Sequence, residues 1–265
     1  TGAELLTKYL GLQKCFFALS KGEKEAAEKL RGICSEITGA ELKLVKRCYP
    51  NGSDKVLAYD LTKRRIKAGQ TPDEQGLLIL NISTVGFIGR YAKTGMPLVK
   101  RRVTIDGSAV RTPCNVMAII GTPVSKLLEF ADCRIEAVWH IVSGGPMMGK
   151  ELAGTDTPFT KTMNSIIAST EPIMDKKYKE ANRLTNCIRC GSCIEACPMR
   201  LDPEMLDKVV RARDYKAFEE HLGMNCIECG CCSFICPASR HLTQSCRDGK
   251  AAVMAARRKA QAAKK

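Results

Sequence analysis

Two runs of cysteine near the C-terminus constrain this chain more than any other feature. In each run the cysteines follow the spacing C-x2-C-x2-C-x3-C, and a proline comes directly after the last one. The first run comprises Cys187, Cys190, Cys193 and Cys197, and the second comprises Cys226, Cys229, Cys232 and Cys236. Three thiolates at successive three-residue intervals allow a tight loop to wrap one face of a cubane, and this spacing is typical of [4Fe-4S] ligands. The tandem repeat therefore predicts two [4Fe-4S] clusters.

The last cysteine of each run is expected to ligate the cluster held by the other run. That exchange is the rule in two-cluster ferredoxins with this spacing. The cluster that we call cluster 1 is then held by Cys187, Cys190, Cys193 and Cys236. The second, cluster 2, is held by Cys226, Cys229, Cys232 and Cys197. This crossing holds the two clusters close together, as electron transfer requires.

Other uses of the cysteines fit the pattern less well. Structural zinc sites combine two C-x2-4-C pairs or mix cysteine with histidine, and a third cysteine in register does not belong to that pattern. Disulfide-dense chains are short and secreted, whereas this chain has 265 residues. The remaining cysteines are expected to be small buried residues or free thiols: Cys15, Cys34, Cys48, Cys114, Cys133, Cys231 and Cys246. Fifteen cysteines in one chain indicate a reducing and anaerobic or otherwise protected compartment.

Net charge and hydropathy limit the kinds of partner that the chain is expected to bind. The formal net charge is +14, and a basic, alanine-rich tail covers 247–265. Such a tail has helical propensity and is expected to be a solvated or disordered terminus, or to contact an acidic partner subunit or an anionic surface. Nucleic-acid binding is not expected because aromatic residues make up 5% of the chain. No apolar run reaches the roughly 18 residues of a membrane span. His140, His221 and His241 show no spacing that suggests catalysis, and we predict no catalytic residue.

The first 95 residues alternate between strand-like and helix-like segments. This alternation predicts an α/β layer with a parallel sheet. The expected strands are 14–19, 41–48 and 77–80, and the expected helices are 24–33 and 82–93.

A different pattern begins near residue 96. Strands at 98–106, 117–120 and 137–142 flank a helix at 125–130, which suggests a β-grasp-like module over 96–149. The Pro-, Thr- and Ser-containing segment 150–183 is expected to be an extended connector. An α-helical two-cluster ferredoxin domain follows over 184–246. In it Asp202 is a candidate N-cap, with Pro203 at the first helical position, and a second short helix is expected over 215–222.

The cysteine runs and several glycine-rich segments resemble a known family. The segments Asn186–Met199 and Asn225–Pro237 closely resemble the C subunit of the Rnf complex, an ion-translocating ferredoxin:NAD+ oxidoreductase. Shorter matches are Gly-Met-Pro-Leu at 95–98, Thr-Ile-Asp-Gly at 104–107, Ile-Gly-Thr-Pro at 120–123 and Gly-Gly-Pro-Met-Met-Gly at 144–149. The resemblance covers roughly residues 40–246 and implies the complex I flavoprotein-subunit fold for the α/β layer.

The resemblance also implies where flavin and nicotinamide bind. The segment Tyr49-Pro-Asn-Gly-Ser-Asp-Lys55 looks like a family segment near FMN and NADH, which nominates Tyr49, Gly52 and Asp54. Asp54 is one methylene shorter than the family's usual glutamate. Asn81 and Thr84 stand where the family places polar contacts to FMN. The family's glycine-rich phosphate loop is absent from this sequence, so we expect a truncated or split protein, a loop from another polypeptide, or a chain that only relays electrons.

The function implied is electron transfer between NAD(H)/FMN and a ferredoxin-like carrier through two [4Fe-4S] clusters. The partners would be other subunits of a membrane redox complex, with this chain peripheral on the cytoplasmic face of the cell membrane. One alternative is a soluble flavin/iron–sulfur reductase, such as a cobalamin reductase or a selenoenzyme electron donor. Another is a non-catalytic ferredoxin-like wiring module.

Overall fold

The computed structural model describes residues 1–171 and 185–263. The chain divides into two compact units, Thr1–Pro97 and Leu98–Lys265, and each is described by itself. The first unit therefore ends two residues beyond the predicted boundary at residue 95. No helix in the described ranges is long and apolar enough to cross a membrane.

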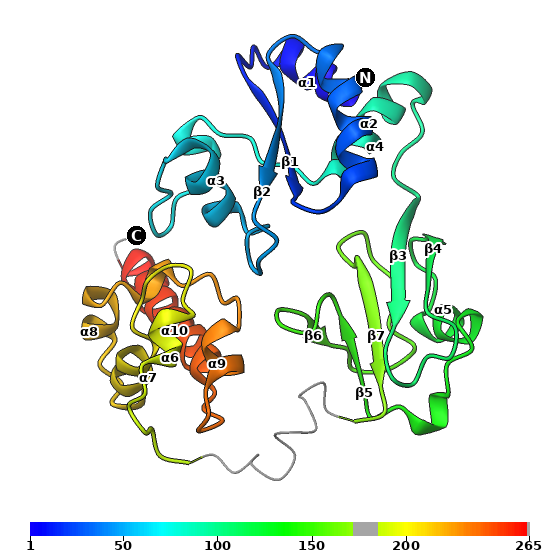
Figure 1. The fold of residues 1–265 in the computed structure, drawn as a ribbon. Coiled ribbons are helices and arrows are strands. Elements are labelled where there is room, and N and C mark those ends of the chain that lie inside the picture. Colours follow the sequence, from blue (N-terminus) through cyan, green and yellow to red (C-terminus); the bar gives the residue numbers. More distant parts are fainter. Residues whose placement is uncertain (172–184, 264–265) are drawn as a thin grey trace. The chain divides into compact units, whose positions relative to one another are not determined.

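The first unit contains a parallel two-stranded sheet, as the alternating pattern predicted. Strand β1 (Cys15–Ser20) pairs with β2 (Ala40–Val45) in the register Cys15↔Ala40, and α2 (Lys24–Ser35) connects the two strands. Figure 1 shows these elements in blue. The same unit contains the helices α1 (Gly2–Tyr9), α3 (Asp54–Thr62) and α4 (Ile82–Thr94), the last drawn in teal. The 3-10 turn η1 (Asp73–Gln75) lies between α3 and α4. A small buried core contains Ala3, Phe17 and Ile37.

One predicted strand of the first unit is wrong. Leu77–Leu80 forms neither helix nor strand, and Leu78 and Leu80 are exposed. An apolar run of this length forms a strand only where a neighbouring strand completes its hydrogen bonds, and none pairs with it among the described residues. The following helix, expected over 82–93, is confirmed as α4.

The second unit begins with a mixed five-stranded sheet in the order β4-β3-β7-β5-β6. Its strands are β3 (Lys100–Asp106), β4 (Cys114–Ile119), β5 (His140–Ser143), β6 (Lys150–Glu151) and β7 (Ser165–Ser169). The core includes Val103, Leu128, Phe159 and Ile166, with Leu128 contributed by α5 (Val124–Phe130). The turn η2 (Ile135–Ala137) occupies the start of the segment that was expected to be a strand from residue 137.

The sheet also includes part of the expected connector. Strand β7 lies between β3, to which it is parallel, and β5, to which it is antiparallel. The segment 150–171 therefore completes the sheet instead of leaving it, and the part of the expected connector from 172 to 183 lies outside the described residues.

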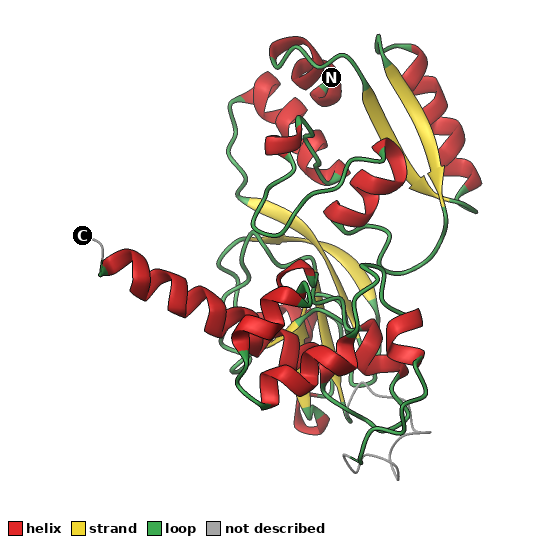
Figure 2. Ribbon diagram, turned by 90° about the vertical axis from the view of Figure 1, so that its left-hand side faces the viewer, coloured by secondary structure: helices red, strands yellow, loops and turns green. Residues whose placement is uncertain are grey.

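Helices dominate the C-terminal part of the second unit, as expected for the cluster domain. They are α6 (Ser192–Glu195), α7 (Pro203–Arg211), α8 (Tyr215–Glu220), η4 (Gly223–Asn225), α9 (Cys231–Ile235) and α10 (Leu242–Ala262). The predicted cap is confirmed, because Asp202 Oδ1 accepts hydrogen bonds from the backbone N–H groups of Glu204 and Met205, each at 3.1 Å. Figure 2 shows α10 as one long helix, and it contains the basic tail from Arg247 to Ala262.

Candidate functional site

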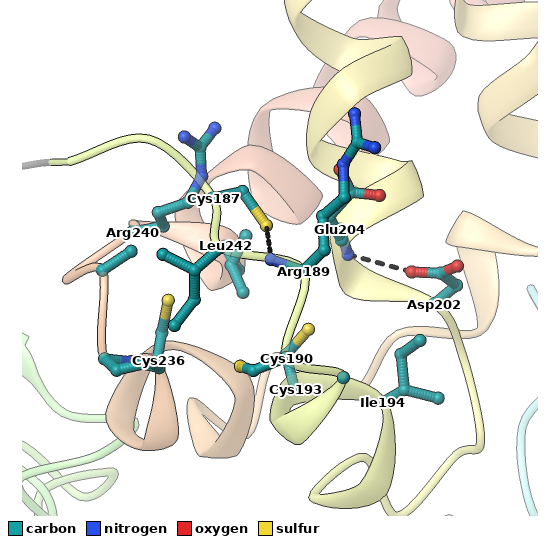
Figure 3. Close-up of a pocket in the computed structure, with 14 residues that line it drawn as sticks. Cys187, Arg189, Cys190, Cys193, Ile194, Asp202, Glu204, Cys236, Arg240 and Leu242 are labelled. Carbon is teal, nitrogen blue, oxygen red and sulfur yellow. Dashed lines mark hydrogen bonds between the residues drawn. The ribbon is translucent and has the colours of Figure 1, made fainter.

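The first cysteine run bends around a cavity of about 220 Å³. Figure 3 shows Cys187, Cys190 and Cys193 from this run, with Cys236 from the second run, around the same space. Two positive backbone angles shape the loop, φ 57° at Arg189 and φ 78° at Gly191. The first of these directs the backbone N–H of Arg189 to Cys187 Sγ, at 3.4 Å. A thiolate that ligates iron is stabilised by such a donor.

The second run forms a matching loop around a smaller cavity of about 20 Å³. Glu228 and Gly230 repeat the positive angles, with φ 57° and φ 86°, and the backbone N–H of Glu228 donates to Cys226 Sγ at 3.3 Å. Cys197 belongs to this cavity, where its sulfur accepts from the backbone N–H of Leu201 at 3.4 Å. The two loops are thus structural repeats as well as sequence repeats.

The two cavities divide the eight cysteines four and four, in the crossed arrangement. Cys236 of the second run lines the first cavity, and Cys197 of the first run lines the second. Helices α6 and α9 pack against each other, and each leads its run from the third cysteine to the fourth. The fold therefore brings together the two groups of residues that the sequence assigned to cluster 1 and cluster 2.

The donors around each cavity are thiols. A [4Fe-4S] cluster takes one thiolate at each of four irons. Four cysteines spaced around a cavity are the arrangement that a cubane needs.

Two further thiols line the second cavity, Cys231 and Cys246. Burial, with the nearby Cys229, raises the pKa of Cys231 to about 12. A hydrogen bond between the thiols of Cys246 and Cys226 lowers the pKa of Cys226 to about 7 and raises that of Cys246 far above its ordinary value. Cys246 was expected to be a scattered buried thiol. It is buried, but it lies on α10 beside Cys226, a contact that its position outside the second run did not reveal.

Charged side chains of α10 reach the second loop. Arg247 Nε donates to a carboxylate oxygen of Glu228 at 3.3 Å, and Lys250 forms an ion pair with the same carboxylate. Lys250 Nζ also donates to the backbone carbonyl of Cys226 at 3.1 Å. Arg189 occupies the equivalent position in the first loop and is exposed. The two cavities therefore differ in the charge of their nearest side chains.

The expected flavin contacts lie in the first unit, at the starts of two helices. Tyr49, Gly52 and Asp54 are exposed, and Asp54 is the first residue of α3. Asn81 caps α4, where its Oδ1 accepts from the backbone N–H of Ser83 at 2.9 Å, and Thr84 lies exposed in the first turn. Neither cysteine-lined cavity includes any of these five residues. The hydrogen bond to Ser83 gives Asn81 a structural role as the N-cap of α4, and this role does not require a flavin.

Two family models match the chain. The model described as the Nuo51 FMN-binding domain matches residues 1–90, and the 4Fe-4S dicluster domain matches residues 179–237. The first covers most of the first unit, and the second covers both cysteine runs. The expected order of an α/β flavin-type domain and a two-cluster domain is confirmed.

Relatives resemble the chain across most of its length. The C subunit of the proton-translocating ferredoxin:NAD(+) oxidoreductase complex of Clostridium ljungdahlii is 34% identical over 84% of the chain and 48% of the relative. The corresponding protein of the Na(+)-translocating complex of Acetobacterium woodii is 33% identical over 97% and 57%, respectively. The C subunit of the ion-translocating oxidoreductase complex of Haemophilus influenzae is 32% identical over 83% and 33%. The chain thus spans one third to just under three fifths of the length of these relatives.

A solved structure shares the fold. The H2-reduced NAD+-reducing [NiFe]-hydrogenase contains a chain that superposes with a TM-score of 0.61 at 13% identity, over 93% of this chain and 49% of that one. At this identity the likeness is one of fold. The relatives carry the assignment: by homology over most of its length, the chain belongs to the family of C subunits of the ion-translocating (Rnf) oxidoreductase complexes.

Proposed function

We propose that this chain passes single electrons through two [4Fe-4S] clusters as part of a membrane-associated Rnf-type ferredoxin:NAD+ oxidoreductase complex. The observation that supports this function most directly is the division of the eight cysteines between two neighbouring cavities in the crossed arrangement. The names of the relatives supply the type of complex. Other subunits and a ferredoxin-like carrier are the proposed partners, and the cytoplasmic face of the cell membrane is the proposed location.

Each cysteine loop would present its thiolates and backbone N–H groups to one cluster. Cluster 1 is proposed to bind Cys187, Cys190, Cys193 and Cys236, and cluster 2 to bind Cys226, Cys229, Cys232 and Cys197. Cys190 and Ile188 are exposed, whereas Cys229 and Cys232 are buried. The edge of the first loop is therefore the place where a redox partner approaches closest to a cluster.

The first unit is proposed to bind FMN and to meet NAD(H). The match of residues 1–90 to an FMN-binding domain supports this assignment, with Tyr49, Gly52, Asp54, Asn81 and Thr84 as the proposed contacts. When bound, FMN exchanges two electrons with nicotinamide and single electrons with iron–sulfur clusters. The chain's part is to bind and orient these groups. We also propose that the five-stranded sheet is the β-grasp module, which extends past residue 149 to include β7.

The ligand assignment is tested by pairs of serine variants in the anaerobically reconstituted chain. Cys236→Ser is expected to remove the same dithionite-reduced EPR signal as Cys187→Ser, and Cys197→Ser the same signal as Cys226→Ser. Iron and sulfide analysis should show one cluster lost in each variant. Cys48→Ser, at an exposed cysteine outside both cavities, is the matched control. If Cys236→Ser instead removes the signal lost in Cys226→Ser, the crossing is wrong.

The electron path is tested by reducing the same protein with NADH in the presence of FMN. Bleaching of the visible thiolate-to-iron band is expected, and dithionite gives the full extent for comparison. Reduction by dithionite but not by NADH would contradict the flavin assignment and leave a two-cluster relay. A chain that binds fewer than two clusters would contradict the proposed function itself.

A further inference from the structure

A largely buried arginine lies beside the cavity proposed for cluster 1. Arg240 follows Cys236 by four residues and lines this cavity together with Cys187 and Cys236. Figure 3 shows it on the same side of the cavity as Cys187. Its side chain is 11% exposed. A guanidinium charge is seldom buried unless a partner compensates it.

The compensating partner is Asp207, on α7. This carboxylate is 4% exposed and forms an ion pair with Arg240. Ser245 Oγ donates to it at 2.6 Å, and Arg211 Nε donates to it at 3.1 Å. Burial raises the pKa of Asp207, but these hydrogen bonds outweigh burial and the pKa lies below its ordinary value. The aspartate is therefore ionised and holds one end of the guanidinium in place.

One donor of Arg240 has no partner. Its Nη groups are used, since Nη2 meets Asp207 and Nη1 lies 3.5 Å from the carbonyl oxygen of Thr185. Its Nε is buried and finds no hydrogen-bond acceptor in the part of the chain that the structure describes. A buried hydrogen-bond donor without an acceptor lowers the stability of the folded state. The sulfur atoms of a bound cluster are hydrogen-bond acceptors, and such bonds help to set cluster potentials.

We propose that Arg240 raises the reduction potential of cluster 1, through its positive charge at the cavity and its unpaired Nε–H, and that Asp207 holds it there. The inference rests on the ligand set proposed above for cluster 1. Reduction adds one negative charge to the cluster, and a cation beside the cavity stabilises that charge. In the described part of the chain, the lining of the cavity proposed for cluster 2 contains one charged side chain, Glu228, and the cations beside it, Arg247 and Lys250, pair with that carboxylate.

The test is an EPR-monitored redox titration of the reconstituted chain. Arg240→Gln is expected to shift the one-electron equilibrium of one cluster about tenfold toward the oxidised form, a potential lower by about 59 mV, and to leave the other unchanged. Glu228→Gln should move the other potential. Arg211→Gln is the matched control, since Arg211 bonds to the same aspartate but is 53% exposed and lies outside the cavity lining. It should move neither potential.

Iron and sulfide content is measured first, because it distinguishes a failure of the proposed function from a failure of the proposed role of Arg240. A wild-type chain without two reducible clusters contradicts the proposed function. A wild-type chain with both clusters, but with potentials unchanged in Arg240→Gln or equally shifted in Arg211→Gln, overturns the role of Arg240. The role of Arg240 is also overturned if Arg240→Gln and Glu228→Gln shift the reduction potential of the same cluster. Arg240→Gln removes one of the partners of the buried Asp207 and leaves Arg211 and Ser245. The double variant Arg240→Gln/Asp207→Asn is therefore titrated alongside it, and the same outcomes are expected.

Discussion

At the scale of single residues, the sequence reveals a side chain's role when that role depends on near neighbours. The cap at Asp202 could be predicted from the sequence, and so could the grouping of the eight cysteines around two cavities, because local spacing defines both geometries. Arg240, Asp207 and Cys246 could not be linked to the clusters in this way. Arg240 meets Asp207 of α7 across 33 residues of sequence, and Cys246 of α10 meets Cys226 of the second run. No local pattern encodes either contact.

The ion pairs around Asp207 give the first prediction at this scale. Asp207→Asn should lower the free energy of unfolding by roughly 3–5 kcal/mol, because it leaves a buried guanidinium uncompensated. Glu219→Gln removes a partner of Arg257 from an exposed pair and should cost no more than about 1 kcal/mol. Anaerobic denaturant titration of the reconstituted variants measures both. Equal losses in the two variants would show that burial does not distinguish the pairs.

At the scale of elements, the sequence predicted helices and strands that a local pattern marks. It did not predict a strand that forms only by pairing with distant parts of the chain. Helices α2, α4, α5 and α7 were anticipated because apolar periodicity or a cap marks each of them. Strand β7 was missed because Ser165-Ile-Ile-Ala-Ser169 is a short run in a Thr- and Ser-rich segment. It becomes a strand by pairing with β3, about 60 residues earlier, and with β5. Helix α10 begins at Leu242, before the first residue of the basic tail at 247.

Two glycines in helices are predicted to respond oppositely to alanine. A Cβ at Gly249 of α10 would lie 2.7 Å from Val210 Cγ2 and 2.8 Å from the Phe218 ring. Gly249→Ala should therefore destabilise the helical domain by about 1–3 kcal/mol, as overpacking does. A Cβ at Gly32 of α2 meets nothing within 4 Å. Gly32→Ala should stabilise its helix by up to about 1 kcal/mol. Amide hydrogen exchange in α10 and α2 measures each effect locally, and stabilisation of α10 by Gly249→Ala would contradict the packing.

At the scale of the whole molecule, the buried apolar residues are unevenly shared. Among the described residues, the core of the five-stranded sheet contains fourteen buried apolar residues. The helical domain buries nine, and seven of these line one of the two cysteine cavities. A domain whose buried apolar residues mostly surround such cavities gains much of its stability from bound metal, whose binding free energy becomes folding free energy. The sheet does not depend on such a contribution.

Removal of the clusters should therefore unfold one part of the chain and spare another. Treating the reconstituted protein with a chelator and an oxidant is expected to release iron and to raise amide exchange from α6 to α10. Exchange in β3, β4, β5 and β7 should stay as slow as before, because Val103, Ile105, Leu128 and Ile166 remain packed without metal. Hydrogen-exchange mass spectrometry, resolved by peptide, compares the two states. Cys48→Ser, treated in parallel, separates loss of the clusters from oxidation of an exposed thiol. If exchange rises equally in the sheet and in the helices, the two parts share their stability and the clusters support both.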